Sequence, residues 1–553
     1  MPVQVSYPGV YIQEVSSGVH TITGVSTSIA AFFGRTARGP INKAVRCLSF
    51  ADFIREFGGP HPLSDLAQSV RQFFDNGGTD CYVVRLAAGA AAASLTLKDV
   101  SNTLKVLKAT AKDPGLWGQN IKLEVDYNTP NPDESFNMRV IYEGDDGSII
   151  SQEDFNNLSM KPSSPRFAPP FVSQSSKLID LAVHTDMGDP NNSTSTYNKS
   201  PVAKPTDSPP TGVGYSESRR PFVGADAPGL ITSITNDFNA LMATNGSFAI
   251  SINGAPFVNV DLTGSPNIGG GGATMDSLAG DITALINSKL TGGAAVKCSW
   301  SDVGTGLFTV VLRINSASGD FSSVNIRRSP SNDLAGPMML GLDQGGIEVT
   351  RWSNLRPVPN GSVYMGGTAF GSISDGINTI AGRSQKNFNT IKIAGTDVDL
   401  SGLVLAGIPA GSLWYVQPSS GIDGIRQRLR IIVDAINNNN PNTGWKAELW
   451  GYHIALRKKQ GAINDIGTVV SNGVSPTPGT LGSGFVNNVR QYGLGPSSLG
   501  TFTLHEGAPA NDGTVPLLPE YSGSPTSHTG FYALDKVDLF NLMILPGDRE
   551  ITE

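Results

Sequence analysis

The chain is poor in charged residues and lacks long apolar runs. Of its 553 residues only 16% are Asp, Glu, Lys or Arg, and the formal net charge is −7. A protein that binds the phosphate backbone of nucleic acid needs a basic face. The negative net charge therefore argues against nucleic acid as the main partner. No apolar run approaches the roughly 18 residues that span a bilayer. The first four residues also lack the start of a signal peptide, and we expect no direct membrane insertion.

Cysteine and histidine are scarce and scattered. Cys47, Cys81 and Cys298 lie far apart without a C-x-x-C pair, which predicts buried free thiols in a protein folded in reducing cytoplasm. None of the histidines stands at i, i+4 spacing or beside a cysteine. They are His20, His61, His184, His453, His505 and His528. We expect neither a metal site nor a cofactor.

Sequence signatures of catalysis are also missing. No G-x-S-x-G elbow and no nucleotide-binding glycine motif occurs, and the run 269–272 is typical of a loop tip. Asp535 and Asp538 could form a carboxylate pair for general acid–base catalysis. A position at a helix end, on either side of Lys536, explains these two residues better. The basic cluster 457–459 suits a solvated strand end, with a salt bridge to an acidic neighbour as the alternative. We expect no enzyme.

What the chain does contain is glycine and proline, at 64 and 36 residues, with 39% hydrophobic residues. That composition favours strands and turns over long helices and is sufficient for packed cores. The length predicts three or four domains. We therefore expect a multidomain α+β protein.

The first residues alternate as an extended strand does, after a Pro-Gly turn. This segment consists of Tyr7, Pro8, Gly9, Val10, Tyr11, Ile12, Gln13, Glu14 and Val15. A terminal strand is disordered, folds back on its own body, or pairs with another subunit. A second apolar strand follows within 26–40 and ends at a Gly-Pro break.

A compact α/β unit is predicted next. The pattern predicts a short helix at Phe50–Phe57, and an apolar face on a 3.6-residue period predicts a second helix over 63–74. Gly77-Gly78 ends that helix, and a strand is predicted at 81–86. Near the end of the sequence, 539–545 is a nearly continuous apolar run before Pro-Gly, which predicts a strand buried on both faces.

Two stretches in the middle repeat one order of elements. The first has a hairpin at 248–262, an amphipathic helix ending at Asn287, then Trp300 and a strand. The second has a hairpin at 390–400, a helix ending at Asn437, then Trp445 and a strand. This common order predicts a tandem duplication, with repeated use of an ordinary hairpin–helix–strand pattern as the alternative.

Several of these segments together resemble contractile tail sheath proteins, found in contractile-tailed phages and related injection particles. The resemblance is carried by 7–15, 26–40, the Phe-Phe-x-Asn-Gly-Gly pattern with its strand at 73–86, 111–120, 153–160, 504–507, 511–513 and 534–547. It implies a discontinuous α/β sheath core with β-rich inserted domains and an extended N-terminal arm. In that family the arm, here 7–15, adds as a strand to a neighbouring subunit's sheet.

The resemblance and the repeat give a division of the chain. We expect an N-terminal arm (1–24), a first core segment (25–92), three inserted domains (93–229, 230–384 and 385–499) and a second core segment (500–553) that packs against the first. The third inserted domain would repeat the second. No segment of this sequence matches the family's last third, so we expect either a fragment or a separate polypeptide that completes the core.

The resemblance further implies a function without a cofactor. Copies would stack as hexameric rings around an inner tail tube, between baseplate and tail terminator proteins. Contraction would drive the tube through a bacterial envelope, as in viral genome ejection. Such a protein is a component of a virion tail, or of a phage-like particle, assembled in the bacterial host cytoplasm. The alternatives are a tail-associated hydrolase and an adhesin or capsid-like structural protein.

Overall fold

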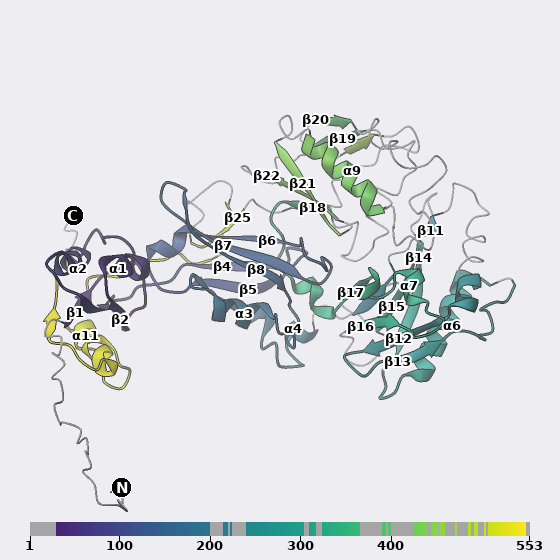
Figure 1. Ribbon diagram of the computed structural model, residues 1–553, viewed down its shortest axis with the longest axis horizontal. Helices are drawn as coiled ribbons and strands as arrows, with labels where there is room; N and C mark the ends of the chain where they lie inside the picture. Colours follow the sequence, from purple (N-terminus) through teal and green to yellow (C-terminus); the bar gives the residue numbers. More distant parts are fainter. Residues whose placement is uncertain are drawn as a thin grey trace, which may run out of the picture. The chain divides into compact units, whose positions relative to one another are not determined.

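The protein is mixed α and β, with several sheets and few helices. The computed structural model describes residues 29–199, 214–218, 222–223, 239–271, 273–302, 309–316, 323–364, 390–393, 396–399, 425–438, 444–451, 453–458, 470–472, 485–487, 491–495, 503–504 and 507–548. The chain divides into two compact units, residues 1–88 with 514–553 and residues 89–513. The first unit combines the purple and yellow ends of the chain in Figure 1.

The unit formed by the two ends of the chain contains one four-stranded sheet. Its order is β2-β3-β1-β27, with β1 (Ile29–Gly34) between two strands that are distant in sequence. Both β3 (Asp80–Arg85) and β27 (Leu542–Ile544) run parallel to β1, and β2 (Ala44–Cys47) pairs antiparallel with β3. The second segment thus completes a sheet that the first segment begins.

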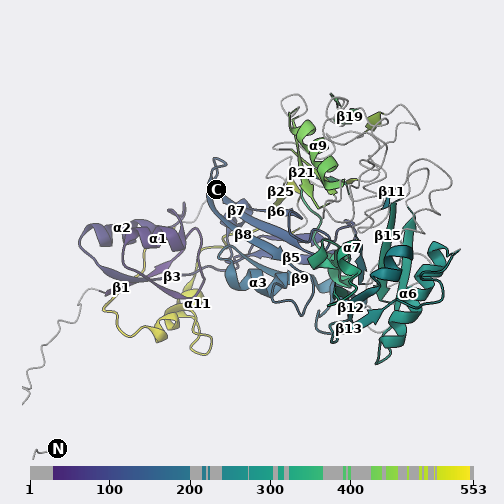
Figure 2. The same cartoon turned by 45° about the vertical axis from the view of Figure 1, so that its right-hand side comes forward.

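Strand β1 is buried on both faces. Ala30 and Phe32 point into one apolar cluster with α1 (Phe50–Phe57) and α2 (Leu66–Asp75). Ala31 and Phe33 point into another, with residues of α11 (Leu518–Ser522) and the 3-10 helix η10 (Gly530–Lys536). Figure 2 shows α1 and α2 on one side of β1 and β3, and α11 on the other. Since successive side chains of a strand alternate, both layers are required to cover it.

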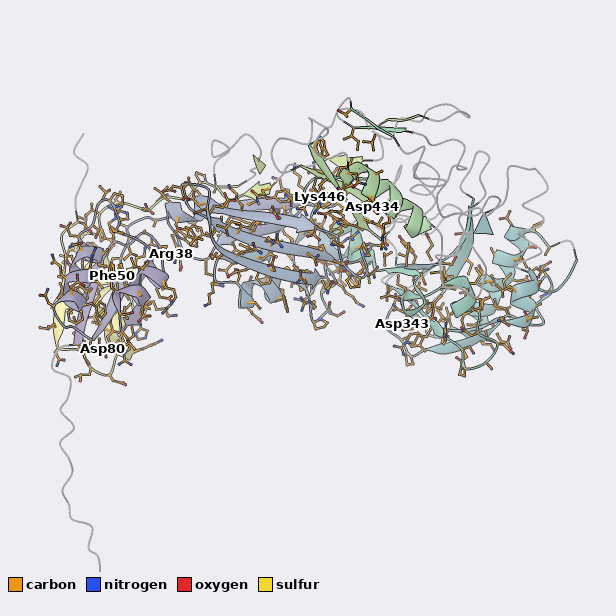
Figure 3. The ribbon with its side chains drawn as sticks, turned by 45° about the horizontal axis from the view of Figure 1, so that its top comes forward. Arg38, Phe50, Asp80, Asp343, Asp434 and Lys446 are labelled. Carbon is orange, nitrogen blue, oxygen red and sulfur yellow. The ribbon has the colours of Figure 1, made fainter. Side chains whose placement is uncertain are left out.

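Local signals explain the helices of this unit. The Ser49 hydroxyl accepts a hydrogen bond from the Asp52 backbone N–H and caps α1 immediately before Phe50, labelled in Figure 3. Gly58 follows with φ of 78°, a conformation that favours glycine, and ends the helix. The apolar face of α1 then presents Phe53 and Phe57 to the sheet.

The larger unit begins with two sheets that share one apolar core. One has the order β4-β5-β9 and the other β26-β25-β6-β7-β8. Their bounds are β4 (Ser94–Lys98), β5 (Lys105–Ala111), β6 (Ile121–Asp126), β7 (Phe136–Glu143), β8 (Ile149–Leu158), β9 (Ile179–Val183), β25 (Gln491–Gly493) and β26 (Thr503–Leu504). Helical segments are η1 (Leu116–Asn120), α3 (Ala168–Ser175), η2 (Thr185–Met187) and α4 (Thr196–Lys199).

Late residues complete this early core, which shifts an expected boundary. Strand β25 pairs with β6, and the Ala508 N–H donates to the Ser94 hydroxyl. Asn511 forms a bridge with Ala91. The second core segment is expected from residue 500, but the chain returns to the terminal unit only at Thr514. Among the described residues before it, Ala508, Ala510 and Asn511 have hydrogen-bond partners in the larger unit.

Two further modules follow in the larger unit. The first contains β10 (Tyr215–Glu217), β11 (Phe222–Val223), β12 (Ser247–Ile252), β13 (Val258–Asp261), α6 (Met275–Lys289), β14 (Val296–Asp302), β15 (Thr309–Ser316), β16 (Val324–Arg328), α7 (Ala335–Met338), η3 (Leu342–Gln344), β17 (Ile347–Val349) and η4 (Arg351–Leu355). The second contains β18 (Ser362–Tyr364), β19 (Thr390–Ile393), β20 (Thr396–Asp399), α9 (Ile425–Asn438), β21 (Trp445–Trp450), β22 (His453–Lys458), β23 (Val470–Asn472) and β24 (Phe485–Asn487).

The strand orders of the two modules correspond. The sheet β13-β12-β16 matches β20-β19-β23, and β14-β15-β10-β17 matches β21-β22-β18-β24. Every pairing in these four sheets is antiparallel, and β11 is an addition in the first module. The matching series start at Tyr215 and Ser362, earlier than the expected bounds of 230 and 385.

An asparagine near the end of each module's long helix makes the same pair of hydrogen bonds. The Asn287 side chain donates to the Val296 carbonyl at 3.0 Å and accepts from the Val296 N–H at 2.7 Å. The Asn437 side chain donates to the Ala447 carbonyl at 3.0 Å and accepts from its N–H at 2.8 Å. Each asparagine joins helix to strand by satisfying both backbone groups of one residue.

We predict that Asn287→Ala and Asn437→Ala each loosen the helix–strand joint of their own module. Each change leaves a partly buried N–H and C=O without the asparagine, at a cost of roughly 1–3 kcal/mol. Hydrogen-exchange mass spectrometry should show faster exchange of 296–302 in the first variant and 445–450 in the second. The exposed neighbour Asn438→Ala is the matched control and should leave exchange unchanged. Equal exchange in all three variants would contradict the role of the paired hydrogen bonds.

Candidate functional site

The predicted strand-adding arm lies outside the described residues. It comprises Tyr7 to Val15, and the described chain begins at Ile29. The surfaces that remain open to an added strand can be found in the described residues of the terminal unit. There the sheet ends at β2 on one side and at β27 on the other.

The β27 side of this sheet is apolar and exposed. Leu542, Met543 and Leu545 have 48%, 45% and 51% of their surface exposed. The expectation that 539–545 is buried on both faces is therefore wrong. An apolar run signals burial only where neighbours exist on both sides, and among the described residues β27 has a strand partner on one side alone.

Hydrogen bonds fix β27 at both of its ends. The Asn541 N–H donates to the Ile29 carbonyl at 2.9 Å, and the Asp65 N–H donates to the Gly547 carbonyl at 3.0 Å. Asp548 then bridges to Ser64. Burial raises the pKa of Asp548, whereas the Ser64 hydroxyl and the Arg35 guanidinium oppose that shift. The edge is held in position by its own subunit.

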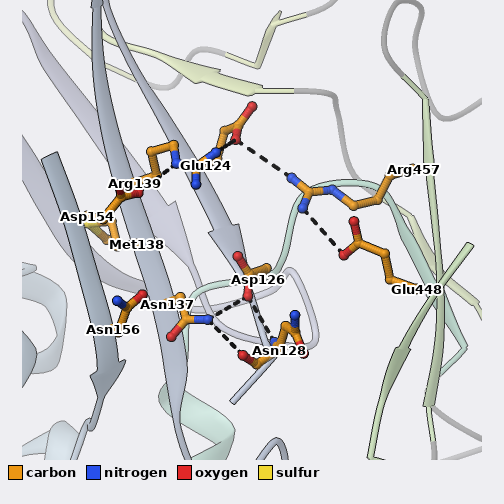
Figure 4. A pocket seen from close by; sticks show the side chains of 10 residues that line it. All are labelled: Glu124, Asp126, Asn128, Asn137, Met138, Arg139, Asp154, Asn156, Glu448 and Arg457. Atoms are coloured by element: carbon orange, nitrogen blue, oxygen red, sulfur yellow. Dashed lines mark hydrogen bonds and ion pairs between the residues drawn. The ribbon is translucent and has the colours of Figure 1, made fainter. Parts of the chain in front are cut away.

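A polar pocket of about 240 Å³ lies in the larger unit, between the β6-β7-β8 sheet and the hairpin β21–β22. Figure 4 shows its side chains. They are Glu124, Asp126, Asn128, Asn137, Met138, Arg139, Asp154, Asn156, Glu448 and Arg457. Four carboxylates thus face two guanidinium groups.

Arg457 connects the two walls of this pocket. Its guanidinium lies 3.8 Å from a Glu124 carboxylate oxygen on β6 and 3.6 Å from Glu448 on β21 (Figure 4). Of the two interpretations of the basic cluster 457–459, the salt bridge to an acidic neighbour is the one observed at Arg457. Residue 459 lies outside the described residues. Arg139 pairs with Asp154 at 2.6 Å within its own sheet.

The chemistry of the pocket is that of an ionic joint between sheets. Asp126 accepts hydrogen bonds from the Asn128 N–H and the Asn137 side chain, and burial raises its pKa. No three His, Cys, Asp or Glu residues of the described chain gather as metal ligands do. Sequence reasoning did not find Glu124, because its partner Arg457 is far away in the chain.

The remaining candidates from the sequence do not converge on one site. Asp535 lies 3.0 Å from His528, and both side chains are about half exposed. The Gly269 N–H donates to the Asn239 side chain in a loop, and residue 272 lies outside the described residues. His20 and His505 also lie outside them. Within the described chain, no helix is long and apolar enough to cross a membrane.

Cysteine placement was only partly foreseeable. All three cysteines are free and buried. Nothing in the sequence indicated that Cys47 and Cys81 would stand opposite each other on β2 and β3. Their strands were recognisable as apolar segments, but the register that pairs them is set by the folded sheet.

Comparisons with known proteins give a distant likeness. No family model and no curated protein matches this chain. A sheath tail protein from Desulfitobacterium hafniense is similar in structure at 15% identity and a TM-score of 0.22, over 32% of this chain and 35% of that one. One from Listeria innocua is similar at 15% identity and a TM-score of 0.20, over 29% and 30%. The chain spans about a third of each, so the function proposed below rests on its own residues.

We predict that Arg457→Gln loosens the contact between β21–β22 and the β6 sheet. The change removes two partly buried ion pairs and leaves Glu124 and Glu448 facing each other, at a cost of about 1 kcal/mol. Limited proteolysis of the full chain should cut 444–458 faster. Arg139→Gln, which removes ion pairs with Asp154 and Glu124 that both lie within the β6-β7-β8 sheet, is the control and should not raise that rate. If both variants resist cleavage as the parent does, Arg457 does not join the sheets.

Proposed function

We propose that this chain is the structural subunit of a contractile tail sheath. Copies polymerise as stacked hexameric rings around an inner tube, between baseplate and terminator proteins, and contract to drive the tube through a bacterial envelope. The particle is a virion tail or a phage-like injection device assembled in the host cytoplasm. The protein acts as a structural component and not as an enzyme.

The observation that carries this proposal is the exposed apolar edge of the terminal sheet. Sheet edges of monomeric proteins are protected by charge, proline or a covering element, because an open edge recruits other strands. The segment 539–545 contains no charged residue and no proline. Leu542 and Met543 on it are about half exposed, while Asn541 and Gly547 anchor it on either side. In a subunit that polymerises, such an edge can form a contact with a neighbouring copy.

The arm 7–15 supplies the other half of the assembly contact. Its backbone N–H and C=O groups need partners, and a neighbouring copy's sheet edge provides them by strand addition. Val10 and Ile12 alternate with polar or aromatic residues, which suits one face on a partner and one toward solvent. Arms paired in this way would keep subunits connected while the lattice rearranges.

Contraction needs no cofactor in this proposal. An extended sheath is metastable, and contraction exchanges one set of contacts between subunits for a better-packed set. A heterologous contact that does not close along the axis generates a helix. The energy is therefore stored in interfaces during assembly.

The two modules with matching strand orders are, in this proposal, copies of one inserted domain. Their support is the shared sheet topology and the asparagine at the end of each long helix. Each module contains its own sheets and helix, so neither requires the terminal sheet for its hydrogen bonding. Modules of this kind can decorate the outside of a sheath without altering its contraction.

We expect the 553-residue protein, alone or co-expressed with a tube protein, to assemble into long hollow tubes with a ridged wall. Negative-stain electron microscopy checks this outcome. A protein that remains monomeric in both situations, and that degrades polysaccharide with loss of activity on Asp535→Asn, would instead support the hydrolase alternative.

Deletion of residues 2–20 should leave a soluble, folded protein that no longer polymerises. In this proposal the arm pairs as a strand with a neighbouring copy, and the described core folds without it. Circular dichroism checks folding and sedimentation checks assembly. Normal tubes from the deletion variant would remove the arm from the mechanism.

Charge placed on the β27 edge should also block assembly. Leu542→Lys introduces a charge at an exposed position of the edge strand, with little cost to the monomer, within about 0.5 kcal/mol. Sedimentation should show loss of tubes. Ile149→Lys, at an apolar residue of the edge strand β8 in the larger unit that is at least as exposed as Leu542, is the matched control and should assemble. Assembly of the Leu542 variant would contradict the role of this edge.

A further inference from the structure

Two buried thiols face each other across the outer strand pair of the terminal sheet. Cys47, the last residue of β2, stands opposite Cys81 on antiparallel β3. Both side chains are fully buried and belong to the same apolar cluster, which includes Phe53 of α1 and Val70 of α2. They therefore point to the same face of the sheet.

The spacing of such a pair is close to that of a disulfide. Opposite residues of an antiparallel pair have Cα atoms about 4.5–5.5 Å apart, within the range of about 4.4–6.8 Å that disulfides span. Their Cβ atoms are about 4.5–5.5 Å apart, whereas a disulfide brings them to about 3.5–4.5 Å. A movement of roughly 1 Å is needed. Strand β2 has four residues and lies at the edge of the sheet, so it can make that movement.

We propose that Cys47 and Cys81 are a reversible oxidation site that forms an intramolecular disulfide when the folded protein meets a disulfide oxidant such as oxidised glutathione. The Cys47 thiolate attacks one sulfur of the oxidant and releases one glutathione thiolate. The Cys81 thiolate then attacks the Cys47 sulfur and releases the second. The two cysteines lose two protons and two electrons, and one oxidised glutathione becomes two reduced ones.

The environment makes this reaction slow and reversible. The neighbouring Cys47 thiol and burial hold the pKa of Cys81 above its usual value, so the Cys81 thiolate is scarce while the strands are closed. The small strain in a cross-strand disulfide favours its later reduction. Oxidation therefore proceeds through opening of β2, and one ring, from Cys47 to Cys81, comes to enclose both α1 and α2.

An ion pair beside the thiols controls the opening of β2. Arg46 donates to both carboxylate oxygens of Asp80, at 3.0 and 2.6 Å. These residues adjoin Cys47 and Cys81, so the pair holds the two strands together next to the sulfur atoms. Asp80 is labelled in Figure 3. The Arg46 side chain is exposed and Asp80 is buried, and loss of this ion pair is expected to speed oxidation roughly two- to fivefold.

The third cysteine provides an internal control. Cys298 stands opposite Ile314 and has no thiol across the strand pair. Burial raises its pKa to about 12. It should remain a thiol under conditions in which Cys47 and Cys81 react. The inference does not depend on the proposed function.

The test uses the native 553-residue protein, which is incubated with oxidised glutathione, alkylated and then digested with trypsin without reductant. Mass spectrometry should find peptide 47–55 joined to peptide 72–85, with Cys298 alkylated, and excess dithiothreitol should reverse the joining. The oxidised protein should also unfold at higher temperature. Cys47→Ser should abolish the joined peptide, and Cys298→Ser should retain it.

Three outcomes would overturn the proposal. The first is two alkylated thiols at equilibrium in the native protein, and the second is joining that occurs only in urea. The third is an unchanged rate of disulfide formation in Arg46→Gln, a substitution at an exposed side chain. That result would exclude the proposed opening of β2.

Discussion

Burial of β1 on both faces and along both edges is the constraint on which the terminal unit depends. All six residues from Ile29 to Gly34 are buried, so neither helices on one face nor a single partner strand would suffice. The chain meets this requirement with β27 and the segment around η10, which come about five hundred residues later. Everything between 89 and 513 is therefore carried as an insertion in a single small sheet. The closing strand β27 then has an outer edge of its own, which is where we place assembly.

Contacts that stabilise the larger unit differ from the surface that we propose for assembly. In the larger unit, late residues complete early sheets, as β25 does on β6, and ion pairs such as Arg457–Glu124 join neighbouring sheets. These contacts are internal and satisfied. The apolar exposure on β27 is different, because Leu542 and Met543 remain accessible although the strand is fixed at both ends. An exposed but rigid edge suits a partner that arrives as an extended strand, since only the partner loses conformational freedom on binding.

Local patterns in the sequence predicted local elements well. The helix expected at Phe50–Phe57 is α1, and the strand expected at 81–86 is β3, displaced by one residue. The common order around Asn287 and Asn437 anticipated the matching strand orders of the two modules. The sequence did not predict features that depend on residues distant in the chain, namely the burial of a strand and its register. Hydrophobicity marks 539–545 as a strand but cannot say whether both sides are occupied, and a shift of one residue in register would have turned Cys81 away from Cys47.

The most direct test of the account is the exchange of backbone hydrogens on β27, measured in the monomer and in assembled particles of the same protein. In the monomer, β27 has a strand partner only at β1 among the described residues, so its outer N–H groups should exchange quickly. We predict that assembly protects the peptide spanning 538–548, because an added strand takes up those groups. Particles in which this peptide exchanges as fast as in the monomer would contradict the claim that the open β27 edge of the terminal sheet forms the assembly contact.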